Sequence, residues 1–320
     1  MGEHKIAIIG VGATGTVLAA ALLGNYPETV LVGRNPDAGA ALLTKGIRVS
    51  GVISYQSRLK HYITEIESLK NYNPDLIFIT TKTFHLEQVL NYLEDSYQSG
   101  TKIISSQNGL GTEDLIASRF GEDAVFRMSL NYGVSLKNIG HAVTAFFNPP
   151  NHVGSLIPEN NKLAKEIAAM LTEGGLNTEC VDDIKFYVWK KMIMKCTMAS
   201  ICAVTNKTIK DALEFPPTRE VADACFREAL AVARAMGYDF GEEYLDQALG
   251  YLAKVGVHRD SMCFDIDNET PTEIDYLGAK IVAYARQKGI ATPFYVAMTN
   301  MVKAIEDNYL NPEVGMRKSE

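Results

Sequence analysis

The chain has 320 residues, enough for two domains that each bury a core. Apolar residues make up 47% and charged residues 22%, as in ordinary globular proteins. The net charge of −7, without a basic run, argues against a nucleic-acid-binding surface, and no apolar run approaches the roughly 18 residues of a membrane-spanning helix.

The five cysteines are scattered without a CxxC pair, and the six histidines lack the spacing of metal ligands. We therefore expect reduced, buried thiols and no metal site. A strand is predicted from Lys5, which leaves no room for a signal peptide, so we expect a cytoplasmic protein.

A glycine-rich turn follows this first strand, and a small-residue helix follows the turn. In the pattern G-x-G-x-x-G, the first glycine permits the tight bend, the second leaves room for a pyrophosphate, and the third lets the helix pack close to the sheet. Free amides and the positive dipole end at the helix start favour phosphates. We predict a dinucleotide site at Gly10, Val11, Gly12, Ala13, Thr14 and Gly15.

The residue after the second predicted strand, 30–33, bears on the choice of cofactor. Units that prefer NAD usually carry an acidic residue in this region, about 20 residues past the glycines. Here the residue is Arg34, whose charge and forked shape suit a 2′-phosphate, so we predict NADP(H). The alternative is a solvated arginine at a strand end.

Two further predicted strands, 75–82 and 102–109, end in polar residues. Thr81-Lys82-Thr83 and Gln107-Asn108-Gly109 would point into one crevice, because ligands bind at the carboxyl ends of open α/β sheets. Simple exposure is the alternative. Other predicted elements are helices at 38–45, 85–97 and 161–173, short strands at 47–49 and 52–55, and strands completing the sheet at 124–128, 141–147, 153–155 and 177–181.

From residue 182 the pattern becomes helical. Helices are predicted at 185–204, 217–236, 241–254, 272–288 and 293–308, with stops at Gly237, Gly256 and Gly289 and a frayed tail over 311–320. The fold class is therefore α/β, with an N-terminal Rossmann-type doubly wound sheet and an all-α C-terminal domain. We assign residues 1–182 to an NADP-binding domain and 183–320 to a helical substrate and catalytic domain.

Two stretches of the helical half carry candidate acid–base groups. A lysine in 188–195, at the start of the first long helix, can give a proton to a carbonyl oxygen that receives a hydride. Thr272-Glu273 is predicted to open a helix, so that Glu273 can meet a ribose, an amide or an ammonium group.

In the order and spacing of these motifs the chain resembles the ketopantoate reductase family, the NADPH-dependent 2-dehydropantoate 2-reductases. The resemblance covers essentially the whole length. The motifs are the glycine turn, the arginine after strand two, Thr-Lys-Thr at 81–83, Asn108-Gly109, W-x-K at Trp189 to Lys191, and S-M-x-x-D followed by T-E-I-D at 261–275.

The resemblance implies a role for each matching residue. Lys191 would be the general acid, Glu273 would contact the nicotinamide ribose and orient that lysine, and Ser261 would bind the substrate carboxylate. Asn108 and Lys82 would line the cofactor cleft, with Asn108 also near substrate, and Arg34 would hold the 2′-phosphate. For four other residues of these motifs we expect structural roles instead: Lys190 as a solvated neighbour, Trp189 as a packing residue, and Asp265 and Asp275 as caps or surface charges.

One departure concerns the helix that carries Lys191. Family members usually have asparagines four and eight residues later, where this chain has Lys195 and Ala199. In one interpretation, the ammonium groups of Lys195 and Lys191 lower each other's pKa and favour a substrate with an anionic group at that end. In the other, Lys195 points to solvent beside a smaller site.

The implied function is NADPH-dependent reduction of 2-dehydropantoate to pantoate, in pantothenate biosynthesis. The alternatives are reduction of a different 2-oxo acid and a non-catalytic NADPH-binding redox sensor. We expect a small 2-oxo acid as the substrate, no membrane or nucleic-acid partner, and a possible homodimer.

Overall fold

The computed structural model describes residues 4–255 and 257–311. The chain divides into two compact units, Met1–Tyr187 and Val188–Glu320. This division falls inside helix α6 (Ile184–Thr205), a little after the predicted boundary at 182/183. The expected stop at Gly256 and the expected tail beyond residue 311 lie outside the described residues.

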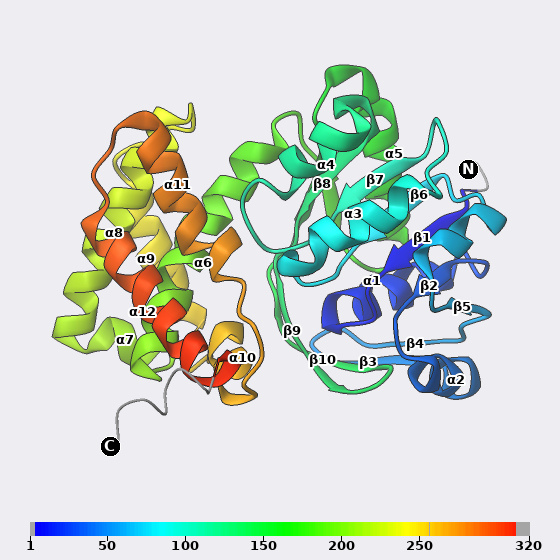
Figure 1. The fold of residues 1–320 in the computed structure, drawn as a ribbon, viewed down its shortest axis with the longest axis horizontal. Helices are drawn as coiled ribbons and strands as arrows, with labels where there is room; N and C mark the ends of the chain where they lie inside the picture. Colours follow the sequence, from blue (N-terminus) through cyan, green and yellow to red (C-terminus); the bar gives the residue numbers. More distant parts are fainter. Residues whose placement is uncertain (1–3, 256, 312–320) are drawn as a thin grey trace. The chain divides into compact units, whose positions relative to one another are not determined.

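An eight-stranded sheet forms the centre of the N-terminal unit (Figure 1). In spatial order its strands are β12 (Thr178–Cys180), β11 (Asn151–Ser155), β8 (Val125–Ser129), β7 (Lys102–Ser105), β6 (Leu76–Ile79), β1 (Ile6–Ile9), β2 (Val30–Val32) and β5 (His61–Ile63). The six strands from β8 to β5 are parallel, and β11 runs antiparallel to β8. The chain moves outward from β1 through β2 to β5, then returns to β6 and moves the other way. The predicted doubly wound Rossmann sheet is confirmed, and its switch point lies between β1 and β6.

Helices cover both faces of this sheet, so both faces are buried. Successive residues of a strand point to opposite faces and therefore enter different apolar clusters. Ile6 and Ile8 pack in one apolar cluster with α1 (Ala13–Leu23) and α5 (Asn161–Glu173). Ala7 and Ile9 pack in the other with α3 (Leu86–Glu94) and α4 (Thr112–Phe120). Helix α2 (Pro36–Lys45) begins at Pro36, and Asn35 caps it by accepting from the amides of Asp37 and Ala38.

A separate four-stranded sheet packs against α1. Its order is β4 (Tyr55–Ser57), β3 (Ile47–Gly51), β10 (His141–Phe147), β9 (Tyr132–Asn138). The prediction that 141–147 completes the main sheet is therefore wrong. Its alternating buried and part-exposed residues suit a sheet with one covered face, and a tight turn at Gly140, φ +74°, pairs it with β9, which was not predicted. Strand β5 was also missed, because it is three residues long and only half-buried.

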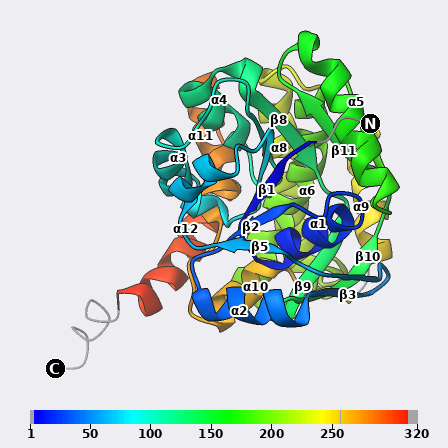
Figure 2. The same cartoon turned by 90° about the vertical axis from the view of Figure 1, so that its right-hand side faces the viewer.

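The described part of the C-terminal unit contains helices and no strand. After α6 come α7 (Ile209–Glu214), α8 (Pro216–Ala235), α9 (Tyr244–Val255), α10 (Ser261–Asp267), α11 (Gly278–Lys288) and α12 (Pro293–Leu310). Figure 2 labels α6 and α8 to α12 among them. The short α7 and α10 were not predicted, since six or seven residues show too little periodicity. The helix expected over 272–288 consists of a 3₁₀ turn, Ile274–Tyr276, followed by α11.

Polar contacts fix helices α6, α8 and α12 of this unit to one another. Both carboxylate oxygens of Glu228, on α8, accept from first-turn amides of α12, at 3.0 Å from Phe294 N and 2.9 Å from Tyr295 N. The hydroxyl of Tyr295 lies 2.6 Å from that of Thr197 on α6. Trp189 is buried and stacks on Tyr238, as expected for a packing residue.

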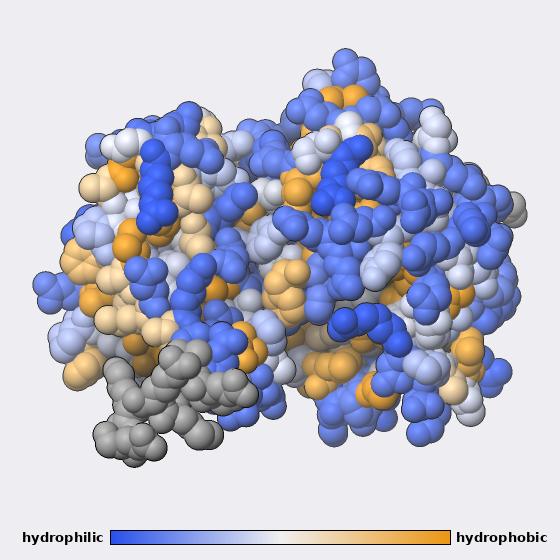
Figure 3. All heavy atoms as spheres, in the orientation of Figure 1, coloured by the Kyte–Doolittle hydropathy of each residue, from blue (hydrophilic) through white to orange (hydrophobic). Residues whose placement is uncertain are grey.

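No helix in residues 4–255 and 257–311 combines the length and apolar character needed to cross a membrane. On the face shown in Figure 3, hydrophilic side chains cover most of each unit, and apolar ones form small groups.

Candidate active site

The three glycines of the turn after β1 are needed for different structural reasons. Gly10 has φ +110°, and a Cβ there would lie 2.8 Å from the amide nitrogen of Thr81. A Cβ on Gly15 would lie 2.0 Å from the carbonyl oxygen of Gly10. Gly12, however, has an ordinary φ of −76° and nothing within 4 Å of the position a Cβ would take. Packing therefore requires glycine at 10 and 15, whereas Gly12 leaves a space that the described chain does not fill.

Helix α1 starts at this open space. Gly12 is its N-cap. The first-turn amides of a helix have no intrahelical acceptor, and here no side chain caps them. Thr80, at the end of β6, donates its hydroxyl to the carbonyl of Gly10 at 2.8 Å and holds the turn against the switch point. Unshared amides, the helix dipole and an unfilled approach fit the pyrophosphate of a dinucleotide.

Arg34 lies on an ordered loop after β2. The Tyr62 hydroxyl contacts the carbonyl oxygens of Gly33 at 2.9 Å and of Asn35 at 2.8 Å, which fixes the backbone on either side of Arg34. The exposed guanidinium lies 3.5 Å from His85 Nε2. Burial, and then the charge of Arg34, lower the pKa of His85, so this imidazole is neutral near pH 7. Arg34 thus supplies the positive charge at this strand end.

The polar ends of β6 and β7 meet at the same edge of the sheet, because the two parallel strands are neighbours. That they form one ligand crevice stays a prediction. Gln107 Nε2 donates to the carbonyl oxygen of Thr81 at 2.9 Å. Lys82 and Asn108, both part-exposed, flank this contact in sequence. The Gln107 Oε1 atom is buried and has no hydrogen-bond partner within the described chain.

Sequence reasoning missed a buried ion pair beside the loop between β7 and α4, which carries Asn108. Arg127, on β8, is 1% exposed, and its Nε lies 3.1 Å from Glu113 Oε2, as an ion pair rather than an aligned hydrogen bond. The same guanidinium donates to the carbonyl oxygens of Ser105 at 3.0 Å and Gly109 at 2.9 Å. Arg127 therefore fixes the β7–α4 loop from inside the unit. An arginine within an apolar strand pattern, Val125–Ser129, was the available signal.

The predicted catalytic residues Lys191 and Glu273 belong to the C-terminal unit, while the predicted glycine turn, Arg34, Lys82 and Asn108 belong to the N-terminal unit. Lys191 is part-exposed on α6 and its neighbour Lys190 is exposed, as expected for a solvated residue. Glu273 is part-exposed and stands directly before the 3₁₀ turn that leads into α11.

Lys195 and Ser261, predicted as substrate-binding residues, are in direct contact. Lys195 Nζ lies 2.9 Å from Ser261 Oγ, and 2.8 and 2.7 Å from the two carboxylate oxygens of Asp260. The reading in which Lys195 points to solvent is wrong, because its side chain is 17% exposed and paired. The interpretation in which Lys195 binds an anionic group did not include Asp260, whose carboxylate balances the positive charge of Lys195. Ala199 is fully buried in α6.

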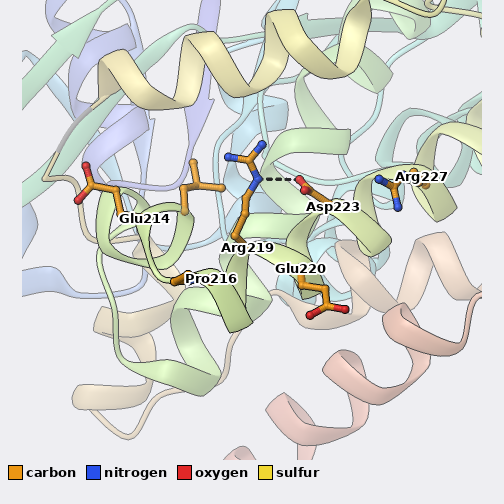
Figure 4. A pocket seen from close by; sticks show the side chains of 7 residues that line it. Glu214, Pro216, Arg219, Glu220, Asp223 and Arg227 are labelled. Carbon is orange, nitrogen blue, oxygen red and sulfur yellow. Dashed lines mark hydrogen bonds and ion pairs between the residues drawn. The ribbon is translucent and has the colours of Figure 1, made fainter.

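An open pocket of about 390 Å³ lies along α7 and α8 (Figure 4). Charged side chains line most of it, and two of them, Arg219 and Asp223, pair at 2.8 Å. None of the predicted site residues is among its lining residues, so this pocket gives no support to the predicted site.

All five cysteines are free thiols, and four of them are buried. Burial raises the pKa of Cys263 to about 11 and that of Cys225 to about 12, so these thiols are protonated near neutral pH. The described residues hold no group of three or more metal-ligating side chains.

Comparisons with known proteins cover nearly the whole chain. Residues 6–156 match the family model described as Ketopantoate reductase PanE/ApbA, and residues 183–306 match Ketopantoate reductase PanE/ApbA C terminal. The chain is 28% identical over 307 residues to the 2-dehydropantoate 2-reductase of Archaeoglobus fulgidus, across 96% of this chain and 99% of that one.

Two solved structures share the fold. One is the ternary structure of D-mandelate dehydrogenase with NADH and anilino(oxo)acetate, with a TM-score of 0.85 and 23% identity over 96% of this chain and 99% of that one. The other is a ketopantoate reductase from Staphylococcus aureus described as dimeric, with a TM-score of 0.75 and 22% identity over 95% and 99%.

Proposed function

Because this chain belongs to the ketopantoate reductase family of NADP-dependent oxidoreductases, we propose that it reduces 2-dehydropantoate to pantoate with NADPH, in pantothenate biosynthesis. The observation that carries the proposal is the glycine turn at the switch point, where Gly12 leaves open space at an uncapped helix start. We assign cofactor binding to residues 1–182 and substrate binding and catalysis to 183–320.

In this proposal the cofactor residues hold the dinucleotide by charge and shape. The amides of residues 12–15 bind the pyrophosphate, and Arg34 binds the 2′-phosphate. Lys82 and Asn108 line the cofactor cleft at the strand ends. When bound, NADPH supplies the hydride, so the protein's own part is orientation, electrostatics and exclusion of water.

The substrate residues of the proposal lie on α6 and in the segments around α10 and α11. Lys191 holds a proton for the oxygen of the substrate's 2-oxo group, Glu273 contacts the nicotinamide ribose and orients Lys191, and Ser261 donates to the substrate carboxylate. Lys195 remains a proposed substrate-binding residue, and it acts on the substrate indirectly, by donating a hydrogen bond to Ser261. The product would leave as a 2-hydroxy acid.

The test measures loss of NADPH absorbance with ketopantoate and with a panel of other 2-oxo acids. We expect the highest kcat/KM with ketopantoate. A higher value with another 2-oxo acid would reassign the substrate, and tight NADPH binding without turnover of any member would indicate a sensor. We also keep as proposals a cytoplasmic location, suggested by five free thiols, and a homodimer, suggested by the dimeric S. aureus protein. Gel filtration with light scattering tests the homodimer.

A further inference from the structure

The ammonium of Lys195 has used all of its donors within the C-terminal unit. An ammonium has three N–H groups, and Lys195 Nζ has three acceptors at 2.7–2.9 Å: both oxygens of Asp260 and the hydroxyl oxygen of Ser261. In this arrangement Lys195 has no N–H left for a direct bond to a substrate.

Asp260 fixes the lysine in this geometry. Its side chain is 6% exposed, and Oδ1 also accepts from the backbone amide of Met262 at 2.9 Å as the N-cap of α10. A buried carboxylate is costly unless it is paired and hydrogen-bonded, and here both conditions hold. The pair therefore keeps a long, otherwise mobile side chain in one position.

Ser261 is the exposed member of the cluster. A hydroxyl has one proton to donate and two lone pairs, and Lys195 donates to one of the lone pairs. No acceptor for the Ser261 proton is found among the residues that the structure describes. A hydroxyl that accepts from a cation is polarised and becomes a stronger donor to an anion.

We propose that Lys195 and Asp260 form a positioning pair for Ser261, which directs the hydroxyl proton of Ser261 to the carboxylate of the substrate. This inference rests on the proposed function, in which Ser261 binds that carboxylate. Lys195 acts through Ser261, so its charge contributes to substrate affinity only while the serine hydroxyl is present.

A mutant cycle tests this coupling. Lys195→Met alone would leave a buried, unpaired carboxylate, so Lys195→Met is combined with Asp260→Asn, which keeps an acceptor for the Met262 amide. We expect the KM for ketopantoate, at saturating NADPH, to rise about tenfold in the double variant, with kcat within about threefold. Ser261→Ala should raise KM at least as much, and the triple variant should equal Ser261→Ala alone.

Multiplication of the two effects in the triple variant would overturn the inference, because independent sites add in free energy. If the double variant does not fold, Asp260→Asn alone replaces it, since this variant keeps the lysine and the helix cap. The same cycle with Ser261→Ala then compares KM values, with a smaller expected rise in KM. Melting temperatures separate loss of substrate affinity from loss of fold.

The matched control is the nearby ion pair between Arg259, which precedes α10, and Asp267, the last residue of α10; this pair does not contact Ser261. Arg259→Met with Asp267→Asn should leave KM within about twofold; a tenfold rise there would assign the effect to the helix and overturn the positioning role. If the unmodified protein reduces no 2-oxo acid, the proposed function fails before any variant is compared. If it is active and the cycle is multiplicative, only the positioning role fails.

Discussion

Alanine at two glycines of the same turn should separate cofactor binding from folding. At Gly12 the new Cβ meets nothing within 4 Å and φ is −76°, which alanine adopts freely. Replacing glycine by alanine at an N-cap costs about 0.5–1.5 kcal/mol, and the smaller entropy of the unfolded alanine chain returns about 0.4–1 kcal/mol. The stability of Gly12→Ala should therefore stay within about 1 kcal/mol of the unmodified protein.

At Gly15 the result should be the reverse. A Cβ there would lie 2.0 Å from the Gly10 carbonyl oxygen, where 3.4–4 Å is ordinary contact, so α1 must move away from the turn. Overpacking in a core costs about 1–3 kcal/mol. Here the clashing atom belongs to the backbone, which can move less than a side chain, so we expect a cost at the upper end of this range. We expect Gly15→Ala to lower the melting temperature by at least about 5 °C.

The Gly12→Ala variant should fold normally but bind NADPH more weakly than the unmodified protein, as measured by fluorescence titration. A Cβ in the open space would hold the pyrophosphate off at least one amide, and loss of one charged hydrogen bond weakens binding about 10- to 150-fold. The reasoning is refuted if Gly12→Ala binds NADPH within about twofold of the unmodified protein, or if it melts as low as Gly15→Ala.

Four further changes give direct tests. Lys191→Met should lower kcat for the 2-oxo acid by about 100-fold or more, since general acids contribute 10²–10⁴-fold, while the titrated Kd for NADPH changes little; an unchanged kcat would remove Lys191 from the reaction. Arg34→Gln should raise the KM for NADPH about tenfold and leave that for NADH unchanged, and equal changes for both would exclude a 2′-phosphate contact. Arg127→Met should cost about 3–5 kcal/mol in urea unfolding because Glu113 is left buried and unpaired; the control is Arg119→Met, at an arginine whose side chain is 25% exposed and whose partner Glu94 is exposed. Burial lowers the pKa of His258 below 6.5, so below that pH the unfolded chain binds more protons than the folded one. The free energy of unfolding should therefore fall as pH drops from about 6.5, and His258→Gln should flatten this slope. An identical slope in the variant would contradict the assignment.

The sequence carried enough information to predict the Rossmann domain and the helical second half, because fully buried parallel strands and long amphipathic helices leave strong local patterns. It was wrong about 141–147, since the choice between two sheets depends on pairing with β3, far away in the chain. The Lys195 contact was missed for a similar reason. Asp260 is 65 residues away, and only folding brings its carboxylate to the lysine.

The sequence predicted the need for glycine at positions 10 and 15, the first for the tight bend and the second for close helix packing, because both steric roles follow from a local motif. Arg127 could not be predicted as the residue that holds the β7–α4 loop, because both carbonyl oxygens that it binds are backbone atoms without a sequence signature.

The loop on which Arg34 stands takes its shape from a phenol on another strand. Since Tyr62 holds the backbone carbonyls of Gly33 and Asn35, the path of the chain does not depend on the side chain at 34. A substitution at 34 therefore alters charge while the main chain stays in place. That makes position 34 a suitable starting point for engineering this scaffold to accept the other nicotinamide coenzyme.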